Sequence, residues 1–207
     1  MADAFHQLWV PLRGGVVDLE PLGREHEPGL WQAARETDWT WMPLDASRSP
    51  NAFRRWLDWL LQNAAEQKIA PFITVQRADG RILGSTQCHD IRPEHRRFEI
   101  GGTWLARSAW RTGANVEAKL LQLEHAFSLG YQRVEFKTHP ENARSRRALE
   151  ALPAQFEGIL RKHLIIREGE PRDSAYYSVI DDEWPAVRAN LQRRLRELQT
   201  PRSHDAP

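Results

Sequence analysis

The sequence predicts a mixed α/β (α+β) fold, in which helices flank a mixed central sheet. Apolar side chains recur at helical spacing in several segments, for example at steps of four, three and four residues within 116–127. Between those segments lie extended apolar runs bounded by turn residues, which is the pattern of strands. Because helices and strands alternate along most of the chain, they are expected to pack as layers around a common sheet.

The N-terminal part is predicted to contain one strand and two helices. A short strand is expected at residues 16–19 and a helix at 24–35. Residues 39–43 form an aromatic loop. A second helix is expected at 51–68, because its apolar residues share one face. These residues are Phe53, Trp56, Leu57, Leu60, Leu61 and Ala64.

Three strands are predicted next. Those at 70–77 and 81–91 are expected to form a hairpin, because the Asp-Gly pair between them is a turn signal. The third strand is expected at 97–105. Gly101 and Gly102 lie inside it and predict a β-bulge or the close approach of a ligand.

The second half of the chain is predicted to end in a hairpin and a helix. The expected elements are a helix at 116–127, a strand at 134–138, a helix at 142–152, strands at 156–167 and 174–180, and a last helix after Asp182. Asn142 and Asp182 are suitable N-caps, and Pro153 ends the helix before it. Residues 1–198 are expected to form a single domain, and 199–207 a polar, disordered tail.

Composition favours a soluble globular protein. Of the 207 residues, 41% are hydrophobic and 28% are charged, and the formal net charge is +1. Interleaved charges of both signs argue against a nucleic-acid binder or a membrane-surface protein. The single cysteine, Cys88, excludes an intramolecular disulfide and fits a reducing compartment. Without an apolar leader or spanning run, a cytoplasmic protein is the default expectation.

The loop before the helix at 116–127 is a candidate anion site. It consists of Arg111, Thr112, Gly113, Ala114 and Asn115. Gly113 allows a tight turn, and Asn115 is expected to cap the helix. The unpaired N–H groups and the positive dipole end of the helix then suit a phosphate or pyrophosphate. The alternative interpretation is an ordinary turn between a strand and a helix.

In their order and motifs, these segments resemble the GNAT superfamily of acetyl-CoA-dependent N-acetyltransferases, and most of all its RimJ/RimL-like branch of ribosomal-protein N-terminal acetyltransferases. The matching segments are 98–101, 111–118, 142–149, 156–161 and 177–184. The chain departs from the family pattern at Trp110, Asn115, Leu149 and Pro153. Trp110 and Asn115 change the two ends of the loop motif, and Leu149 stands where many relatives carry a catalytic tyrosine.

The resemblance implies a GNAT-like fold, whose mixed central sheet has two splayed strands. It also implies acetyl-CoA as the cosubstrate and no metal. The cofactor is then expected between the strand at Thr103, Trp104 and Leu105 and the helix that begins at Asn142, with its pyrophosphate at the 111–115 loop. Arg146, on the same helical face as Asn142, is a further expected cofactor contact.

The implied reaction is acyl transfer from a thioester to a primary amine. An alkyl amine has a pKa of about 10.4 and arrives mostly as ammonium, so a group must accept its proton. Glu99 is the first candidate, followed by His89, Asp90 and His163. Ser145 stands where the resemblance places a hydrogen-bond donor to the departing thiolate. The alternatives are a surface or cross-strand charge for Glu99 and close helix packing for Ser145.

The acceptor, a protein N-terminus or a small-molecule amine, is expected near Trp39 and Trp41. The alternative for these tryptophans is a place in the core. A CoA-binding module that has lost catalysis is the alternative function. Nine tryptophans are more than a domain of this size usually buries. Together with the pairing of many relatives, they favour a homodimer, and a monomer whose surplus aromatics line the acceptor pocket is the alternative.

Overall fold

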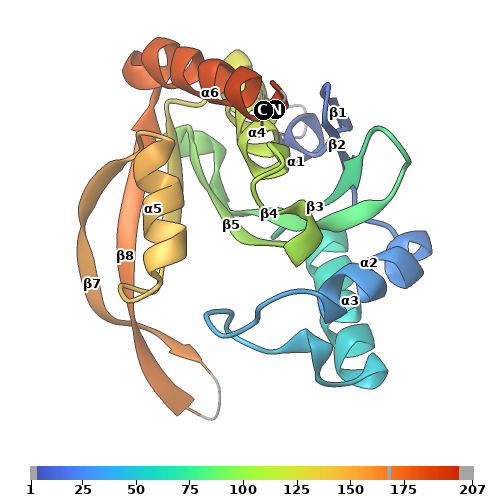
Figure 1. The fold of residues 1–207 in the computed structure, drawn as a ribbon. Helices are drawn as coiled ribbons and strands as arrows, with labels where there is room; N and C mark the ends of the chain where they lie inside the picture. Colours follow the sequence, from blue (N-terminus) through green and yellow to red (C-terminus); the bar gives the residue numbers. More distant parts are fainter. Residues whose placement is uncertain (1–3, 167–168, 201–207) are drawn as a thin grey trace, which may run out of the picture.

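A computed structural model of the chain describes residues 4–166 and 169–200. Within these residues, eight strands form one sheet in the order β1-β2-β3-β4-β5-β6-β8-β7 (Figure 1). Neighbouring strands run antiparallel, except for the parallel pair β5 and β6. The strands are β1 (Leu12–Arg13), β2 (Val17–Pro21), β3 (Ala70–Gln76), β4 (Ile82–Arg92), β5 (Arg97–Leu105), β6 (Arg133–Thr138), β7 (Gln155–Ile166) and β8 (Glu170–Ile180). The predicted mixed sheet is confirmed.

Helices lie on both faces of the sheet. The helices are α1 (Ala4–Leu8), α2 (Glu27–Arg35), α3 (Pro50–Ala65), α4 (Ala114–Ser128), α5 (Ala143–Ala151) and α6 (Trp184–Gln199). In Figure 1, α4 and α6 cover one face, and α2 and α3 lie against the other. On that second face, α2 and α3 cover the part of the sheet around β3 and β4.

The sheet separates two hydrophobic cores. One core lies on the α4 side and includes Phe98 and Leu123. The other lies against α2 and α3 and includes Phe53 and Trp104. Because successive side chains of a strand point to opposite faces, Trp104 and its neighbour Leu105 enter different cores.

The predicted helices and strands are present, with differences at their ends. The sequence did not predict α1 or β1, and β8 begins at Glu170, before its predicted start. The prediction that Asp182 caps the last helix is wrong. Asp182 lies in a short 3-10 turn, and α6 begins with Glu183 as its N-cap. The 3-10 turn occupies residues 181–183. The N-cap of α6 is therefore Glu183, one residue after Asp182.

The C-terminal boundary differs slightly from the prediction. Helix α6 ends at Gln199, one residue inside the segment predicted as a tail. Residues 201–207 of that segment lie outside the described residues, as does Glu168 in the predicted hairpin turn.

Candidate active site

The parallel strands β5 and β6 separate after three paired positions. The pairs are Arg97 with Arg133, Phe98 with Val134 and Glu99 with Glu135. Beyond them, β5 continues to Leu105 and β6 to Thr138 with no further pairing between these described segments. Backbone groups that face such a gap can pair with an extended ligand. The predicted splay is therefore confirmed.

A β-bulge lies in β5 beyond the paired positions, in its pairing with β4. Where β4 has one residue, Thr86, β5 has two, Gly102 and Thr103. Gly102 has a φ of +54°, and a Cβ atom there would lie 2.5 Å from the Gln87 side chain. Both features favour glycine at this position, and the register shift confirms the predicted bulge.

A buried lysine lies behind the bulge, on the α4 side. The Lys119 ammonium donates hydrogen bonds to the Thr86 and Thr103 hydroxyls at 3.0 and 3.1 Å, and to Gln122 Oε1 at 2.9 Å. Among the described residues it forms no salt bridge, and burial lowers the pKa of Lys119 to about 7. The Thr103 hydroxyl is thus engaged in the α4 core, and the backbone of Thr103 borders the gap.

The predicted anion loop has two residues in the left-handed region. Arg111 has a φ of +64° and Gly113 a φ of +93°. The Thr112 hydroxyl donates to the Ala109 carbonyl at 2.8 Å and holds the turn. In the described part of the chain, the backbone N–H groups of residues 111–113 find no acceptor. They lie at the positive end of α4, which suits an anion.

The prediction that Asn115 caps α4 is wrong. The helix begins at Ala114, and Gly113 is its N-cap, so Asn115 lies inside the first turn. A Cβ atom on Gly113 would come within 3.1 Å of Leu195 in α6. The left-handed glycine, which packs against α6, thus turns the chain into α4 two residues earlier than a side-chain cap at Asn115 would.

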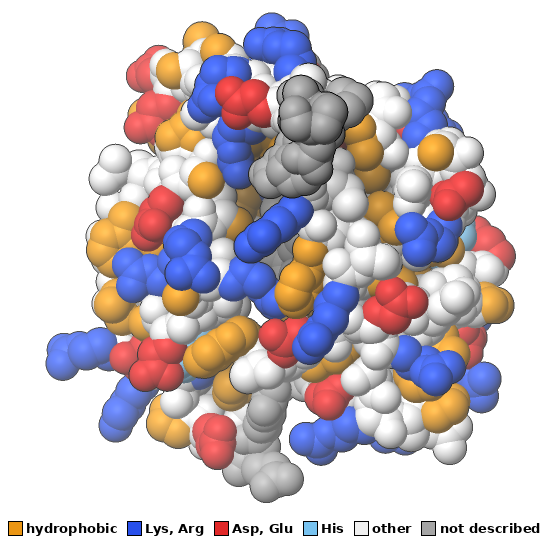
Figure 2. All heavy atoms as spheres, in the orientation of Figure 1, with side chains coloured by type: hydrophobic (Ala, Val, Ile, Leu, Met, Phe, Trp, Pro, Cys, Tyr) orange, Lys and Arg blue, Asp and Glu red, His pale blue; other side chains and the backbone are white. Residues whose placement is uncertain are grey.

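Trp110 fills the space beside the loop. Its indole N–H donates to the Leu105 carbonyl at 3.0 Å. The guanidiniums of Arg144 and Arg107 lie 4.2 and 5.7 Å from its ring centroid, while the Arg111 side chain is exposed. Figure 2 shows Lys and Arg side chains gathered in the middle of this face, between α5 and the segment that leads into α4. Such a basic surface attracts phosphate groups.

Helix α5 presents the predicted cap and a half-buried serine. Asn142 Oδ1 accepts a hydrogen bond from the Ser145 backbone at 3.1 Å, which confirms the cap. The side chain of Arg146 is engaged within the protein. It donates to the Tyr177 hydroxyl at 2.9 Å and to the Pro140 carbonyl at 3.3 Å. Arg146 therefore ties α5 to β8 in this structure.

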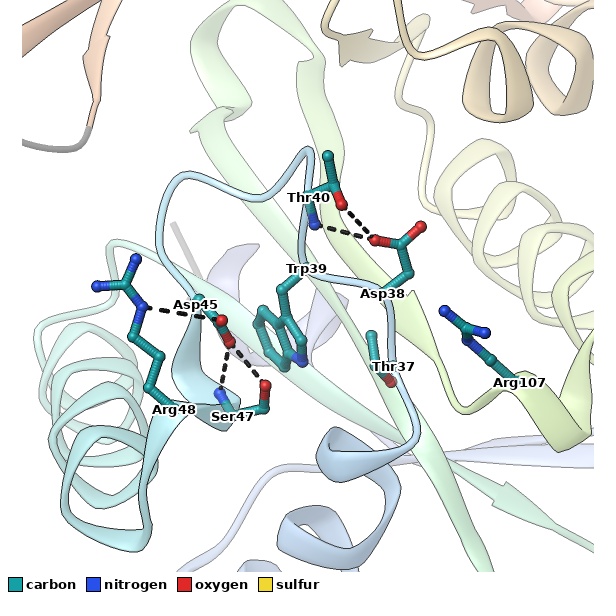
Figure 3. A pocket seen from close by; sticks show the side chains of 8 residues that line it. All are labelled: Thr37, Asp38, Trp39, Thr40, Asp45, Ser47, Arg48 and Arg107. Atoms are coloured by element: carbon teal, nitrogen blue, oxygen red, sulfur yellow. Dashed lines mark hydrogen bonds and ion pairs between the residues drawn. The ribbon is translucent and has the colours of Figure 1, made fainter.

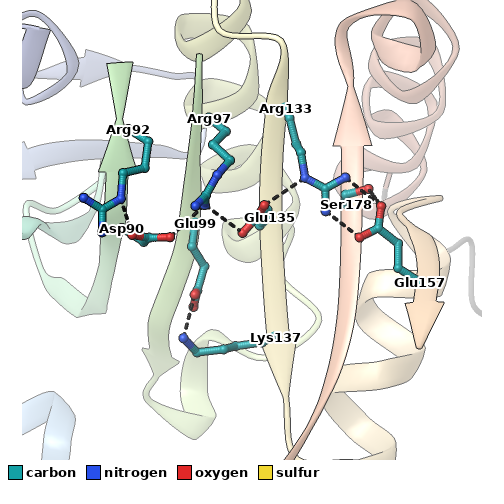
Figure 4. A network of polar contacts seen from close by, with 9 residues as sticks. All are labelled: Asp90, Arg92, Arg97, Glu99, Arg133, Glu135, Lys137, Glu157 and Ser178. Atoms are coloured by element: carbon teal, nitrogen blue, oxygen red, sulfur yellow. Dashed lines mark hydrogen bonds and ion pairs between the residues drawn. The ribbon is translucent and has the colours of Figure 1, made fainter. Parts of the chain in front are cut away.

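Glu99 lies at the last paired position of β5 and β6, where the strands separate. It is 3% exposed, and the Lys137 ammonium donates to its carboxylate at 2.7 Å (Figure 4). Burial raises the pKa of Glu99 above its usual range, although Lys137 opposes the shift. A Cβ atom on Gly101 would lie 2.6 Å from the carboxylate, so this glycine makes room for it. A buried carboxylate with a raised pKa can accept a proton near neutral pH.

The other predicted candidates for the base differ from Glu99. His89 lies opposite Glu99 on β4, and burial lowers the pKa of His89 to about 4. Burial also lowers the pKa of His163. At Asp90, burial raises the pKa, but the guanidinium of Arg97 lowers it, and the net result is a lowered pKa of that carboxylate. Both histidines are therefore neutral at pH 7, and Asp90 is held as an ion-paired carboxylate.

A row of ion pairs runs from β4 across β5, β6 and β8 to β7, on the face that carries Glu99 (Figure 4). Asp90 lies 2.7 Å from Arg97, Arg97 lies 3.3 Å from Glu135, and Glu135 lies 2.8 Å from Arg133. Arg133 also pairs with Glu157. These carboxylates are engaged with arginines, whereas Glu99 pairs with Lys137.

The loop between α2 and α3 reaches the start of α5. Asp38 lies 3.5 Å from the Arg144 guanidinium, and the Trp41 ring lies 4.8 Å from the His139 ring. A polar pocket opens beside this loop (Figure 3). It is lined by Thr37, Asp38, Trp39, Thr40, Asp45, Ser47, Arg48 and Arg107. The loop therefore spans the space between the α2–α3 layer and α5.

The two predicted acceptor residues have different surroundings. Trp39 is 5% exposed, and its ring packs 5.2 Å from Trp104 in the second core. Trp41 is half-buried and stacks on the β6–α5 connection. Trp39 thus anchors the loop in the core, and Trp41 contacts the connection between β6 and α5.

Three buried or half-buried cations near the site were not among the predicted residues: Lys119, Lys137 and Arg172. Lys119 lies four residues before Leu123, on the apolar stripe of its helix, and a charge in that position was a signal of an unusual buried site. Lys137 alternates with apolar neighbours in β6, which placed it on the face opposite the α4 core. Arg172 lies before the predicted start of its strand, so no strand pattern marked it.

Comparison with known proteins identifies the family. A model of the acetyltransferase (GNAT) domain matches residues 17–155. The chain belongs to the GNAT acetyltransferase family. The crystal structure of a GCN5-related N-acetyltransferase from Brucella melitensis is 32% identical, with a TM-score of 0.83 over 96% of this chain and 89% of that one.

Two further relatives extend the comparison. The uncharacterized N-acetyltransferase YoaA of Bacillus subtilis is 31% identical over 108 residues, which are 51% of this chain and 60% of YoaA. The matched part thus spans less than two thirds of that curated relative. Mycobacterium smegmatis RimJ in complex with CoA-disulfide shares the fold, with 23% identity and a TM-score of 0.70 over 89% of this chain and 92% of RimJ.

In residues 4–166 and 169–200, no helix is long and apolar enough to cross a membrane.

Proposed function

We propose that the protein transfers the acetyl group of acetyl-CoA to a primary amine, which attacks the thioester directly. The observation that carries this proposal is the position of Glu99, a buried carboxylate at the point where β5 and β6 separate. Membership of the GNAT family supports acetyl transfer from acetyl-CoA in general. The amine acceptor and the role of Glu99 are the parts that require a test.

The cofactor is proposed to lie in the gap. Its pantetheine arm would pair with the backbone of Thr103, Trp104 and Leu105, as an added strand does. Its pyrophosphate would meet the N–H groups of residues 111–115, with a charge-assisted contact from Arg111. Asn142 and Arg146 would border the arm from α5. Mycobacterium smegmatis RimJ, which shares this fold, forms a complex with CoA-disulfide, and this supports CoA as the kind of ligand.

The proposed chemistry assigns one role to each side of the gap. Glu99 accepts the proton of the ammonium, directly or through water, and so generates the nucleophilic amine. A backbone N–H near Trp104 stabilises the oxyanion. Ser145 donates a hydrogen bond to the departing thiolate, which is a tolerable leaving group. Loss of Ser145 would therefore slow turnover without abolishing it.

The finer assignments are proposals of the same kind. On the sequence motifs given above, a RimJ/RimL-like protein that acts in the cytoplasm on a protein N-terminus or a small amine is proposed. Exposed apolar residues on the edge strand β7 support a homodimer. These residues are Phe156, Ile159, Leu160 and Ile165. Light scattering would then give twice the chain mass of 24.0 kDa, and a constant mass near 24.0 kDa at all concentrations would contradict the dimer.

A CoA-binding module without catalysis is the second candidate function. One observation favours it. Leu149, which stands where many relatives carry a catalytic tyrosine, packs against the core on the α4 side. In that case acetyl-CoA would bind without transfer to any amine.

Thermal unfolding with acetyl-CoA tests the cofactor assignment. Acetyl-CoA should raise the melting temperature, because it binds the native state, and pantetheine, which lacks the pyrophosphate, should raise it far less. Gly113→Val should remove the shift by blocking the loop. Gly130→Val is the matched control, because Gly130 also has a positive φ, of +82°, but faces open space. No shift at millimolar acetyl-CoA would contradict the assignment.

A transfer assay tests the reaction. Purified protein and acetyl-CoA are offered N-terminal peptides, polyamines, aminoglycosides and amino acids, and acetylated products are measured together with free CoA. Product formation that depends on Glu99 supports the enzyme. Acetyl-CoA binding without any product supports the module.

A further inference from the structure

On the sheet face that carries Glu99, strands β6, β8 and β7 hold a second polar cluster beyond the row of ion pairs. Lys137 pairs in register with Tyr176 of β8. The His163 ring lies 5.4 Å from the Tyr176 ring, and its Nδ1 lies 3.1 Å from the Ser174 hydroxyl. Alternate residues of β8 share a face, so Arg172 follows Ser174 and Tyr176 on this side. The cluster therefore lies next to Glu99 and Lys137, on the side where the acceptor is proposed to bind.

Arg172 is an unusual member of this cluster. It is 7% exposed, and its Nε is buried without a hydrogen-bond partner. Among the described residues its guanidinium forms no salt bridge. Burial lowers the pKa of Arg172, and the Glu99 carboxylate, which is near enough to interact, opposes that effect. A buried guanidinium is costly unless an anion with good geometry accompanies it.

The neighbouring groups do not supply that anion. Glu99 already accepts from Lys137 at 2.7 Å. Glu135 pairs with Arg97 and Arg133 in the row of ion pairs (Figure 4). His163 has a lowered pKa and is neutral at pH 7. Within the described residues, the cluster thus keeps one cation in excess.

We propose that Arg172 binds an anionic group of the acceptor, so that the substrate class is a small amine that also carries a carboxylate or phosphate. This inference rests on the proposed function, because it names the acceptor of the same site. The planar guanidinium presents paired N–H donors that match a carboxylate or a phosphate. The amine of such an acceptor would reach Glu99 while its anionic group neutralises Arg172. A polyamine would instead add positive charge to a site that already has an excess.

Steady-state kinetics with matched acceptors tests the proposal. Glycine is compared with methylamine, phosphoethanolamine with ethanolamine, and an N-terminal peptide with spermidine, at saturating acetyl-CoA. The anionic member of the first two pairs should have a kcat/KM roughly 10- to 100-fold higher, as a charge-assisted pair predicts. The first two pairs separate a carboxylate from a phosphate. Equal or faster turnover of methylamine, ethanolamine or spermidine would overturn the inference and leave the proposed function intact.

Variants assign the effect to Arg172. Arg172→Gln should raise KM for the anionic acceptor by roughly 10- to 100-fold and remove its advantage, whereas Arg172→Lys should restore part of it. Arg161→Gln is the matched control, because Arg161 is an exposed arginine of the neighbouring strand β7. The melting temperature of the free protein should not fall in Arg172→Gln, because no described residue depends on its Nε. A fall in melting temperature with unchanged acceptor preference would mark Arg172 as structural.

Absence of transfer to every acceptor would count against the proposed function, and binding then decides the inference separately. Calorimetry in the presence of CoA measures glycine and phosphoethanolamine against wild-type protein and Arg172→Gln. Binding to wild-type protein that Arg172→Gln loses supports the anion site. Equal binding to both proteins, or none to either, contradicts it.

Discussion

Glu99 and Glu117 are both buried glutamates, yet their surroundings differ. Glu117, 5% exposed, lies in the first turn of α4. Its carboxylate accepts backbone hydrogen bonds from Gly15, Val16 and Val17 at 2.8, 2.6 and 2.7 Å. Three fixed donors satisfy it. Glu117 therefore anchors the turn between β1 and β2 to the helix that follows the anion loop.

Glu99 has a single hydrogen-bond donor among the described residues, the flexible side chain of Lys137. Burial raises its pKa, and Gly101 leaves space beside it at the gap. A carboxylate held by rigid backbone donors stabilises the fold, whereas one with a movable partner and a raised pKa can exchange a proton. The comparison predicts opposite responses to mutation at these two positions.

The largest effect is expected on stability at Glu117. Glu117→Ala leaves three backbone N–H groups without this acceptor, of which that of Val17 is buried, and should lower the free energy of unfolding by roughly 3 kcal/mol. The melting temperature should fall by about 6–12 °C for a chain of this size. Glu124→Ala is the matched control on α4, because Glu124 is 45% exposed and pairs with Arg188. Thermal and urea unfolding measure both, and equal losses would show that Glu117 is no anchor.

The next effect is expected on turnover at Glu99. Glu99→Gln removes the proton acceptor and should lower kcat by roughly 100-fold. Acetyl-CoA affinity should stay the same. The free energy of unfolding should change by no more than about 1 kcal/mol, because Lys137 is 24% exposed and can turn to water. Glu135→Gln, at the paired position of β6, serves as the control for rate. Parallel losses of rate and cofactor affinity in Glu99→Gln would mark Glu99 as structural.

The pH dependence of the rate sharpens the assignment. Activity should rise with pH through the raised pKa of Glu99 and then reach a plateau, because only the ionised carboxylate accepts a proton. Lys137 lowers the pKa of Glu99, so Lys137→Met should move the rising limb to higher pH. Profiles of kcat/KM for both proteins measure the shift. If the midpoint of the profile does not move, the group that titrates in the profile is not Glu99.

The smallest effect concerns stability as a function of pH. Because the pKa of Glu99 is raised in the folded protein, its contribution to stability is fully present below the pKa of the unfolded chain. This contribution is lost as pH rises through the higher, folded value. Glu99→Gln should flatten the unfolding free energy across that interval, while wild-type stability falls there. Urea titrations at a series of pH values compare the two, and identical slopes would speak against a raised pKa.

The sequence alone determined the helices, the strands and several local features of the site. Helical periodicity and strand alternation predicted the elements from β2 to α6. Both patterns are local, because a helical face recurs about once a turn and a strand face recurs every second residue. Gly102 marked the bulge, and Asn142 marked the cap of α5, since both depend on local backbone conformation. The resemblance to GNAT proteins added the splayed strands and Glu99 as candidate base.

Only the tertiary structure decided which groups meet. Lys137 is 38 residues from Glu99, and Val17 is 100 residues from Glu117. A repeating pattern states which face a side chain occupies, but it does not state which distant segment covers that face. The start of α4 is a similar case. Local cap preference predicted Asn115 as the N-cap, but the N-cap is Gly113, which packs against α6. Burial, and with it the charge balance around Arg172, arises from neighbours distant in sequence, so it had to be read from the folded chain.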